Sequence, residues 1–114
     1  MAAAFLPWEE WIARLLHPLI VAIRKQTYLL RRRRLLAESL GWPQIEGTIQ
    51  RINADLANPR EEITYVYTTR QGYFSGYFWR WLESSNAREV KVGDKIQLRY
   101  NEGNHHESVV LIDI

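Results

Sequence analysis

Residues Glu61–Trp81, EEITYVYTTRQGYFSGYFWRW, contain the strongest secondary-structure signal in this 114-residue chain. β-Branched and aromatic residues alternate with a period of two on both sides of Gln71-Gly72, which is typical of two antiparallel strands joined by a tight turn. The alternation places Ile63, Tyr65 and Tyr67 on one face of the first strand. We therefore predict a β-hairpin with its glycine at the tip.

Shorter segments with strand character flank this hairpin. Gln44–Asn53 and Lys95–Tyr100 alternate in the same way, and Ser108–Asp113 is a third run of strand-forming residues. Asn53–Arg60 and Asn101–His106 are rich in turn-forming residues and are predicted to be loops. Five short strands with no helical period between them predict a mainly β fold, a small antiparallel five-stranded barrel or sandwich.

Both faces of the second hairpin strand carry aromatic side chains. One face is predicted to pack in the core. The other face could be covered by the N-terminal part of the chain, be exposed as a stacking platform, or contact lipid, and coverage is favoured because large exposed apolar patches are uncommon on monomers. The aromatic residues concerned are Tyr73, Phe74, Tyr77, Phe78, Trp79 and Trp81.

The chain divides into a helical arm, residues 1–40, and the β domain, residues 41–114. In the arm, apolar residues recur every three or four positions, as in an amphipathic helix. Pro18 lacks an amide donor and disfavours helix at the residue before it, so a kink or a break is predicted at His17-Pro18. A second helical run, from Leu19, is expected to end at Gly41.

Basic residues are concentrated in the arm. Residues 1–44 hold seven Lys or Arg and three Asp or Glu, whereas residues 45–114 hold eight and ten. Arg31–Arg34 charge nearly the whole circumference of a helix, because successive residues are about 100° apart. That turn cannot be buried in lipid or in a dry core. It is either a solvated helix face or a contact for anionic lipid headgroups or nucleic acid.

The arm favours lying on a membrane over spanning it. Glu9, Glu10, Arg14 and His17 interrupt its apolar stretch, and each charge at the centre of a bilayer costs on the order of 2.5–3.5 kcal/mol. An interfacial helix keeps these groups in water while its apolar face is buried. The residues predicted to contact a membrane or a partner are Trp8, Trp11, Ile12, Leu15, Leu16, Leu19, Ile23, Arg24, Lys25, Arg31, Arg32, Arg33 and Arg34.

Little in the chain indicates catalysis or ligand binding. The absence of cysteine excludes disulfides and cysteine-ligated metal sites. His105-His106, flanked by Glu102 and Glu107, is the one cluster of ligand-type residues. Because adjacent residues usually point apart, a solvated loop is favoured over a metal site. No serine has a nucleophile motif and no glycines form a phosphate-binding loop. We predict no enzymatic activity, no cofactor and no metal.

Several short motifs follow one another between Trp42 and Leu111. They are Trp42-Pro43-x-Ile45-Glu46-Gly47-Thr48-Ile49, Tyr65-x-Tyr67, Gly72-Tyr73-x-Ser75-Gly76, Val92-Gly93-Asp94, Tyr100-Asn101 and Ser108-Val109-Val110-Leu111. In this order they resemble the bacterial family called domain of unknown function 3592, which commonly has prolines where this chain has Glu102 and His105. The resemblance implies an all-β domain, often attached to membrane helices, with no established activity and no functional residues to carry over.

Together these features predict a non-enzymatic β module held by its basic amphipathic helix at the cytoplasmic face of a bacterial inner membrane, or docked on a protein partner there. The first alternative is a soluble homodimeric binding module whose arm is an oligomerisation helix. The second is a nucleic-acid binder that uses Arg31–Arg34 and the hairpin aromatics. Nucleic acid is less favoured, because a membrane better explains the apolar, tryptophan-bearing helix beside the arginines.

Overall fold

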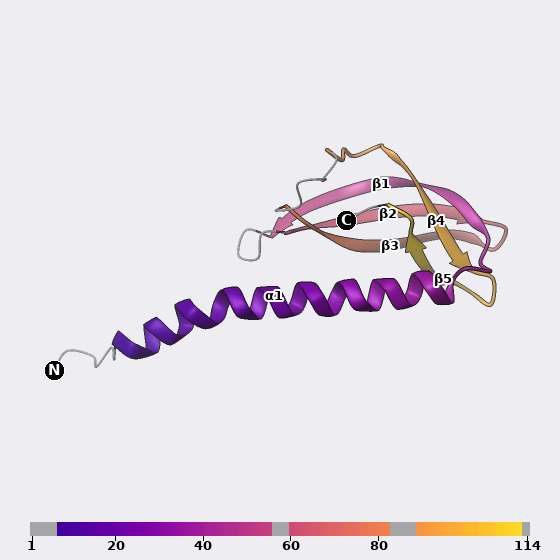
Figure 1. The fold of residues 1–114 in the computed structure, drawn as a ribbon. Coiled ribbons are helices and arrows are strands. Elements are labelled where there is room, and N and C mark those ends of the chain that lie inside the picture. Colours follow the sequence, from indigo (N-terminus) through magenta and orange to yellow (C-terminus); the bar gives the residue numbers. More distant parts are fainter. Residues whose placement is uncertain (1–6, 56–59, 83–88, 113–114) are drawn as a thin grey trace. The chain divides into compact units, whose positions relative to one another are not determined.

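The computed structural model describes residues 7–55, 60–82 and 89–112, and it leaves the side chains of residues 7–11, 13 and 15 undescribed. Within these ranges one helix precedes five strands (Figure 1). The chain folds into two compact units, Met1–Arg31 and Arg32–Ile114. The elements are α1 (Pro7–Glu38), β1 (Gln44–Asp55), β2 (Arg60–Thr69), β3 (Gly72–Trp81), β4 (Lys95–Asn101) and β5 (Asn104–Val110).

The five strands form one antiparallel sheet in the order β3-β2-β1-β4-β5. The sheet curls into a nearly closed barrel, so the two edge strands, β3 and β5, approach each other (Figure 1). The predicted fold class, a small antiparallel five-stranded β structure preceded by a helix, is confirmed.

The predicted hairpin forms as β2 and β3. Its loop is Arg70-Gln71, one residue before the predicted Gln71-Gly72, so Gly72 is not at the tip but opposite Thr69, as the first residue of β3. Gly72 has a φ of +139°, which favours glycine because other residues carry a Cβ. The expected shared face of the first strand is also confirmed, since Ile63 and the two tyrosines that follow it at alternate positions are all buried.

β1 is shared between two neighbours and bends between them. Its first residues pair with β4, and its remainder pairs with β2. The register shifts between Ile49 and Arg51, an irregularity of the kind that bends a strand. At this point the Ile49 amide donates to the Asp94 carbonyl (2.9 Å) and the Gly93 amide donates to the Ile49 carbonyl (2.8 Å). The turn before β4 therefore satisfies the backbone where the ladder is interrupted.

The core lies inside the barrel and receives side chains from every strand. Two tyrosines belong to it, so hydroxyl groups enter an otherwise apolar interior. Its buried members are Ile49, Ile63, Tyr65, Tyr67, Phe78, Ile96, Leu98 and Val110. Gly76 of β3 makes room for one tyrosine: a Cβ at this position would lie 2.4 Å from the hydroxyl oxygen of Tyr65.

The last turns of α1 are fastened to the barrel by two arginines. Arg32 donates to the carbonyl of Val110 (2.9 Å) and to that of Ile112. Arg99 of β4 donates to the carbonyl of Leu36 (3.3 Å). The last turn of α1 has no basic residue of its own, so Arg99 supplies the positive charge that stabilises the carbonyl end of a helix.

The helix departs from the prediction in part. It runs through Pro18, so of the two predicted outcomes, a kink or a break, the break is wrong, and its ribbon bends in the N-terminal, indigo part (Figure 1). It ends at Glu38 instead of continuing to Gly41. The amide of the next residue, Ser39, still donates to the Leu35 carbonyl (2.9 Å), so the helical pattern closes on a fully buried serine.

The predicted loop Asn101–His106 is wrong. Only Glu102-Gly103 form a turn, and β5 already begins at Asn104. The side-chain oxygen of Asn101 accepts a hydrogen bond from the Gly103 amide (2.9 Å), which closes the turn within two residues. As a consequence, His105 is a buried strand residue and not part of a solvated loop. β5 ends at Val110, and Asp113 lies outside the described residues.

Two tyrosines on the outer aromatic face of β3 are not covered by the rest of the barrel, and coverage of this face by the N-terminal part of the chain stays a prediction. Tyr73 is 65% exposed and Tyr77 is 64% exposed. By contrast, Phe78 is buried in the core and Trp81 is buried as well. The outer face of β3 therefore changes along the strand, from open tyrosines near the hairpin loop to a buried tryptophan at the far end.

We predict that Gly76→Ala destabilises the protein by about 1–3 kcal/mol, the usual cost of forcing extra volume into a packed site. The new methyl group must displace the Tyr65 ring, whose hydroxyl oxygen and Cζ lie 2.4 and 2.5 Å from its position. Urea unfolding followed by circular dichroism measures the effect. Gly41→Ala is the matched control, because nothing lies within 4 Å of its Cβ, and it should change stability by less than about 0.5 kcal/mol. Equal stability of the two variants would contradict the close contact.

Candidate functional site

Five apolar side chains of α1 form a stripe on one face of the helix. They are between 43% and 62% exposed, and their spacings of four, three, four and seven residues keep them on one side. We call this set the apolar stripe: Ile12, Leu16, Leu19, Ile23 and Leu30. Exposed apolar side chains gathered on one helix face make this stripe a candidate binding surface.

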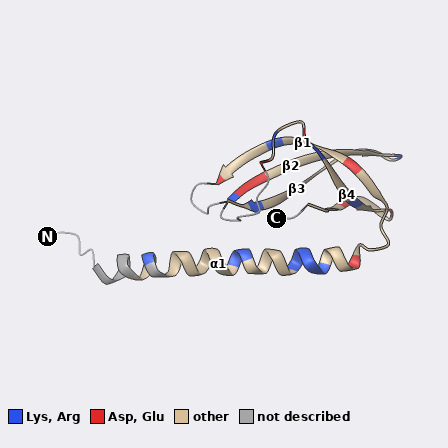
Figure 2. Ribbon diagram, turned by 45° about the horizontal axis from the view of Figure 1, so that its top comes forward, with Lys and Arg blue, Asp and Glu red and all other residues tan. Residues whose placement is uncertain are grey.

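The four consecutive arginines have two different roles. Arg32 is half-buried and bonds to the carbonyls at the end of β5, whereas Arg31, Arg33 and Arg34 are exposed. Helical geometry explains the division. Arg34 follows Leu30 by four residues and continues the apolar stripe, while Arg32 lies about 200° around the helix from Leu30. The run forms a compact basic band near the end of α1 (Figure 2).

The remaining residues of the predicted membrane-contact set are distributed as follows. Arg24 is exposed, and Lys25 is half-buried. The side chains of Trp8, Trp11 and Leu15 lie outside the described residues. Their role in binding, like that of the whole set, stays a prediction. Within the part of the chain that the structure describes, no helix is both long and apolar enough to cross a bilayer.

A second candidate site is the line along which the edge strands β3 and β5 face each other, which we call the seam. Side chains of β2 reach across to β5 here. The hydroxyl of Tyr65 and the Ser108 hydroxyl share a hydrogen bond of 2.6 Å. The hydroxyl of Tyr67 donates to the backbone carbonyl of His105. The barrel is thus closed along the seam by side-chain bonds from its second strand.

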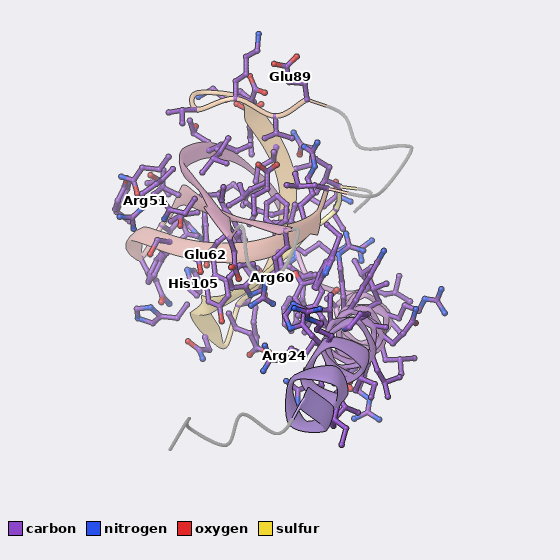
Figure 3. The ribbon with its side chains drawn as sticks, turned by 90° about the vertical axis from the view of Figure 1, so that its left-hand side faces the viewer. Arg24, Arg51, Arg60, Glu62, Glu89 and His105 are labelled. Carbon is purple, nitrogen blue, oxygen red and sulfur yellow. The ribbon has the colours of Figure 1, made fainter. Side chains whose placement is uncertain are left out.

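His105 is held from several sides. Its Nδ1 is hydrogen-bonded to the Thr69 hydroxyl at 2.5 Å, and its ring meets Tyr100 (4.8 Å between centroids) and Phe74 (5.8 Å) edge-on. Figure 3 labels its place in the barrel. Within the described residues no group of three or more His, Cys, Asp or Glu is placed to hold a metal ion. These contacts give His105 a structural role at the hairpin end of the seam.

Burial raises the pKa of the Tyr67 phenol above its ordinary value of 10.0. The neutral phenol is therefore the form present at physiological pH, and it can donate its proton to the His105 carbonyl. Buried tyrosines need such partners, because an unsatisfied hydroxyl in a low-dielectric core is costly.

A pocket of about 300 Å³ opens in the seam, which is at the lower end of the usual size for ligand sites. Hydroxyl, imidazole and carboxylate groups surround it together with one exposed tyrosine face. Its lining residues are Tyr65, Ser75, Gly76, Tyr77, His106, Glu107 and Ser108. The glutamate is already engaged, since Asn101 Nδ2 donates to Glu107 Oε2 (3.2 Å).

Ionic contacts gather at the far end of β2 and β3 from the hairpin loop. The Arg60 guanidinium lies 3.7 Å from the ring centroid of Trp79 and also pairs with Asp55 (3.3 Å). Arg80 is buried 3.6 Å from Glu61, its cross-strand neighbour. Its Nε and one terminal nitrogen have no hydrogen-bond partner among the described residues. These ionic contacts join the ends of β1, β2 and β3.

Sequence reasoning placed the basic helix and the hairpin, but it did not identify the seam. The one available signal was the chemistry of the residues: Tyr65 and Tyr67 occupy core-facing positions, and a buried phenol needs a partner. Which partner it finds depends on strand order, because Ser108 and His105 are distant in sequence. Alternation within a strand carries no information about that order.

Comparison of the chain with family models, with curated proteins and with solved structures found no match. The resemblance of residues 42–111 to the family of unknown function therefore depends on the short motifs alone and stays a prediction.

We expect a double-mutant cycle on Tyr65→Phe and Ser108→Ala to give a coupling free energy of about 1 kcal/mol, the net worth of a typical buried hydrogen bond. The two oxygens are 2.6 Å apart, so each single variant leaves the other hydroxyl without this partner. Chemical unfolding of the four proteins measures the coupling. Tyr73→Phe is the control, because it removes a hydroxyl from an exposed tyrosine of β3. Additive single effects would show that this bond does not help to close the barrel.

Proposed function

We propose that this protein is a non-enzymatic module that lies on an anionic membrane surface through α1 and displays its β barrel there. The observation that carries the proposal is the apolar stripe, which stays in water and is continued by the exposed Arg34. An interfacial helix needs this arrangement: an apolar face to enter the acyl boundary and cations at the level of the headgroups.

The arginines favour a membrane over a second copy of the chain as the occupant of the stripe. A parallel dimer that buries the stripe would also bury Arg34, the next position on the same face. A buried guanidinium without a partner is costly. On an anionic membrane the same side chain remains hydrated and meets phosphate, so the stripe and the charge contribute together.

The cytoplasmic leaflet is the surface that fits best. It carries the anionic lipids that attract basic segments, and positive residues near membranes are retained on the cytoplasmic side. The family resemblance of residues 42–111 adds a bacterial membrane context. We therefore propose the cytoplasmic face of the bacterial inner membrane as the place of action.

The charge term is tested by changing Arg31, Arg33 and Arg34 together to glutamine. Each arginine near an anionic surface contributes about 1 kcal/mol, so affinity for vesicles that contain phosphatidylserine should fall by about two orders of magnitude. Co-sedimentation with the vesicles at low and physiological salt measures it, and the salt dependence should flatten as the charges are removed.

Arg32→Gln is the matched control from the same run. It should leave vesicle affinity within a few-fold of wild type, but lower the melting temperature, because Arg32 bonds to the carbonyls of Val110 and Ile112. If Arg32→Gln and the triple variant lose vesicle binding equally, the division of roles within the run is wrong.

The apolar term is tested by Leu19→Ser with Ile23→Ser. Burial contributes roughly 25 cal/mol per Å² of apolar surface, so this variant should lose binding to neutral and anionic vesicles alike. Ala22→Ser, an exposed position of α1 outside the apolar stripe, should retain it. Sizing in the absence of lipid completes the experiment. Wild-type protein that ignores both vesicle types and forms dimers abolished by the double variant would establish the dimeric alternative instead.

A further inference from the structure

We propose that the pocket in the seam binds a neutral sugar, and that the Tyr77 ring packs against the C–H face of one sugar ring. This inference is independent of the membrane proposal, because it concerns the barrel alone. It starts from three observations on the described residues: a cavity of about 300 Å³ between β3 and β5, an exposed aromatic ring beside it, and a lining of hydrogen-bonding groups without lysine or arginine.

The innermost part of the pocket is formed by hydroxyl groups. Tyr65 is the most deeply buried of its lining residues, at 2% exposed, and its hydroxyl shares the 2.6 Å hydrogen bond with Ser108. Gly76 leaves space beside this contact, because a Cβ there would lie 2.4 Å from the Tyr65 hydroxyl oxygen. A serine hydroxyl can donate one hydrogen bond and accept two, so the bond to Tyr65 leaves Ser108 able to bond to a ligand hydroxyl.

The polar residues on the β5 side of the pocket are held in position by their neighbours. Asn101 Nδ2 donates to Glu107 Oε2 (3.2 Å), and the His106 amide donates to the side-chain oxygen of Asn104 (3.3 Å). The His106 ring also meets the Phe74 ring edge-on, with 4.9 Å between centroids. Groups that are fixed before binding lose less entropy when a ligand arrives. Because a carboxylate accepts at both oxygens, Glu107 can take a further donor from a ligand.

The charge of the pocket lining disfavours an anionic ligand. The lining residues that the structure describes include one carboxylate and no lysine or arginine, and residues 45–114 together hold ten acidic and eight basic side chains. A phosphate or nucleic-acid ligand needs cations that replace its counterions. An apolar ligand fits no better, because the hydroxyl, imidazole and carboxylate groups would lose water without gaining a partner.

A sugar ring matches this surface better than a cation does. Sites for quaternary ammonium groups surround the cation with a cage of aromatic rings. Of the two described tyrosines at this pocket, Tyr77 is 64% exposed, whereas Tyr65 belongs to the core. A sugar ring carries hydroxyl groups around its rim and C–H groups on a face. The rim is complementary to Ser75, Ser108 and Glu107, and the C–H face is complementary to the Tyr77 ring.

Chemical-shift mapping by NMR on the full chain tests the site. The probes are the methyl glycosides of glucose, galactose, mannose and N-acetylglucosamine, each titrated to about 50 mM, because one small ring in an open pocket should bind with a millimolar dissociation constant. At least one glycoside should shift the backbone amides of Ser75, Tyr77 and Ser108 saturably and leave those of α1 unchanged. The absence of a saturable shift with all four glycosides would overturn the inference.

Two tyrosines of β3 provide a matched pair of variants. Tyr77→Ala removes the ring beside the pocket and should weaken glycoside binding about tenfold or more, whereas Tyr77→Phe keeps the ring and should bind within a few-fold of wild type. Tyr73→Ala is the control, because Tyr73 is equally exposed, at 65%, but does not line the pocket. It should bind like wild type. All three variants should keep the wild-type melting temperature, since both side chains are exposed.

The sugar ring can belong to a soluble saccharide or to the headgroup of a glycolipid, and a vesicle experiment separates these sources. It uses the Leu19→Ser, Ile23→Ser variant, in which the apolar stripe is weakened, with neutral vesicles that do or do not contain a galactosyl lipid. Co-sedimentation only with the glycolipid vesicles, abolished by adding Tyr77→Ala, would assign the headgroup. Binding of free glycosides without co-sedimentation would assign a soluble saccharide.

Two further results would contradict the proposal. Equal loss of glycoside binding in Tyr73→Ala and Tyr77→Ala would assign the contact to the open outer face of β3 and not to the pocket. Shifts of the pocket amides by tetramethylammonium chloride, with none by the glycosides, would make this a cation site that uses Glu107 and Tyr77.

Discussion

The barrel depends on the hydrogen bonds that two tyrosines of β2 make with β5. Among the described residues no backbone ladder joins the edge strands, so Tyr65 and Tyr67 close the barrel through Ser108 and the His105 carbonyl. Both phenols are buried, which strengthens each bond and makes its loss costly. Gly76 is also needed for this closure, because a side chain there would push the Tyr65 ring away. The seam can therefore remain open at its backbone while the fold stays closed.

The helix is integrated with the barrel through a different chemistry. Arg32 and Arg99 place guanidinium groups on backbone carbonyls, one at the edge of β5 and one at the end of α1. Carbonyls at these two places have no hydrogen-bond partner within their own helix or strand. The arginines therefore donate to backbone acceptors that secondary structure does not pair. The core cluster of the described residues has no member from α1, whereas charge-assisted hydrogen bonds join the end of α1 to the barrel.

Local patterns predicted most of the fold. The alternation in β2 and β3, broken near a glycine, was sufficient for the hairpin to within one residue of its loop, and the spacing of apolar residues was sufficient for the helix. The errors arose where a side-chain hydrogen bond, and not a repeating pattern of residues, determines the local structure. The side-chain oxygen of Asn101 accepts a hydrogen bond from the Gly103 amide and closes a short turn. β5 therefore begins at Asn104, and His105 is a strand residue. The contacts of Tyr65 and of Arg32 join residues far apart in the chain, which no period of two or 3.6 reveals.

The position of Arg32 within the arginine run fixes the angle between its side chain and the apolar stripe on the same helix. A single residue inserted between Leu30 and Arg32 would turn the apolar stripe by about 100° relative to the Arg32 side chain. Arg31, Arg33 and Arg34 can be substituted without altering this angle. Adding or removing one residue between Leu30 and Arg32 does alter it. The face of α1 on which the stripe lies, relative to Arg32, is thus determined by the number of residues between them and not by their hydrophobicity.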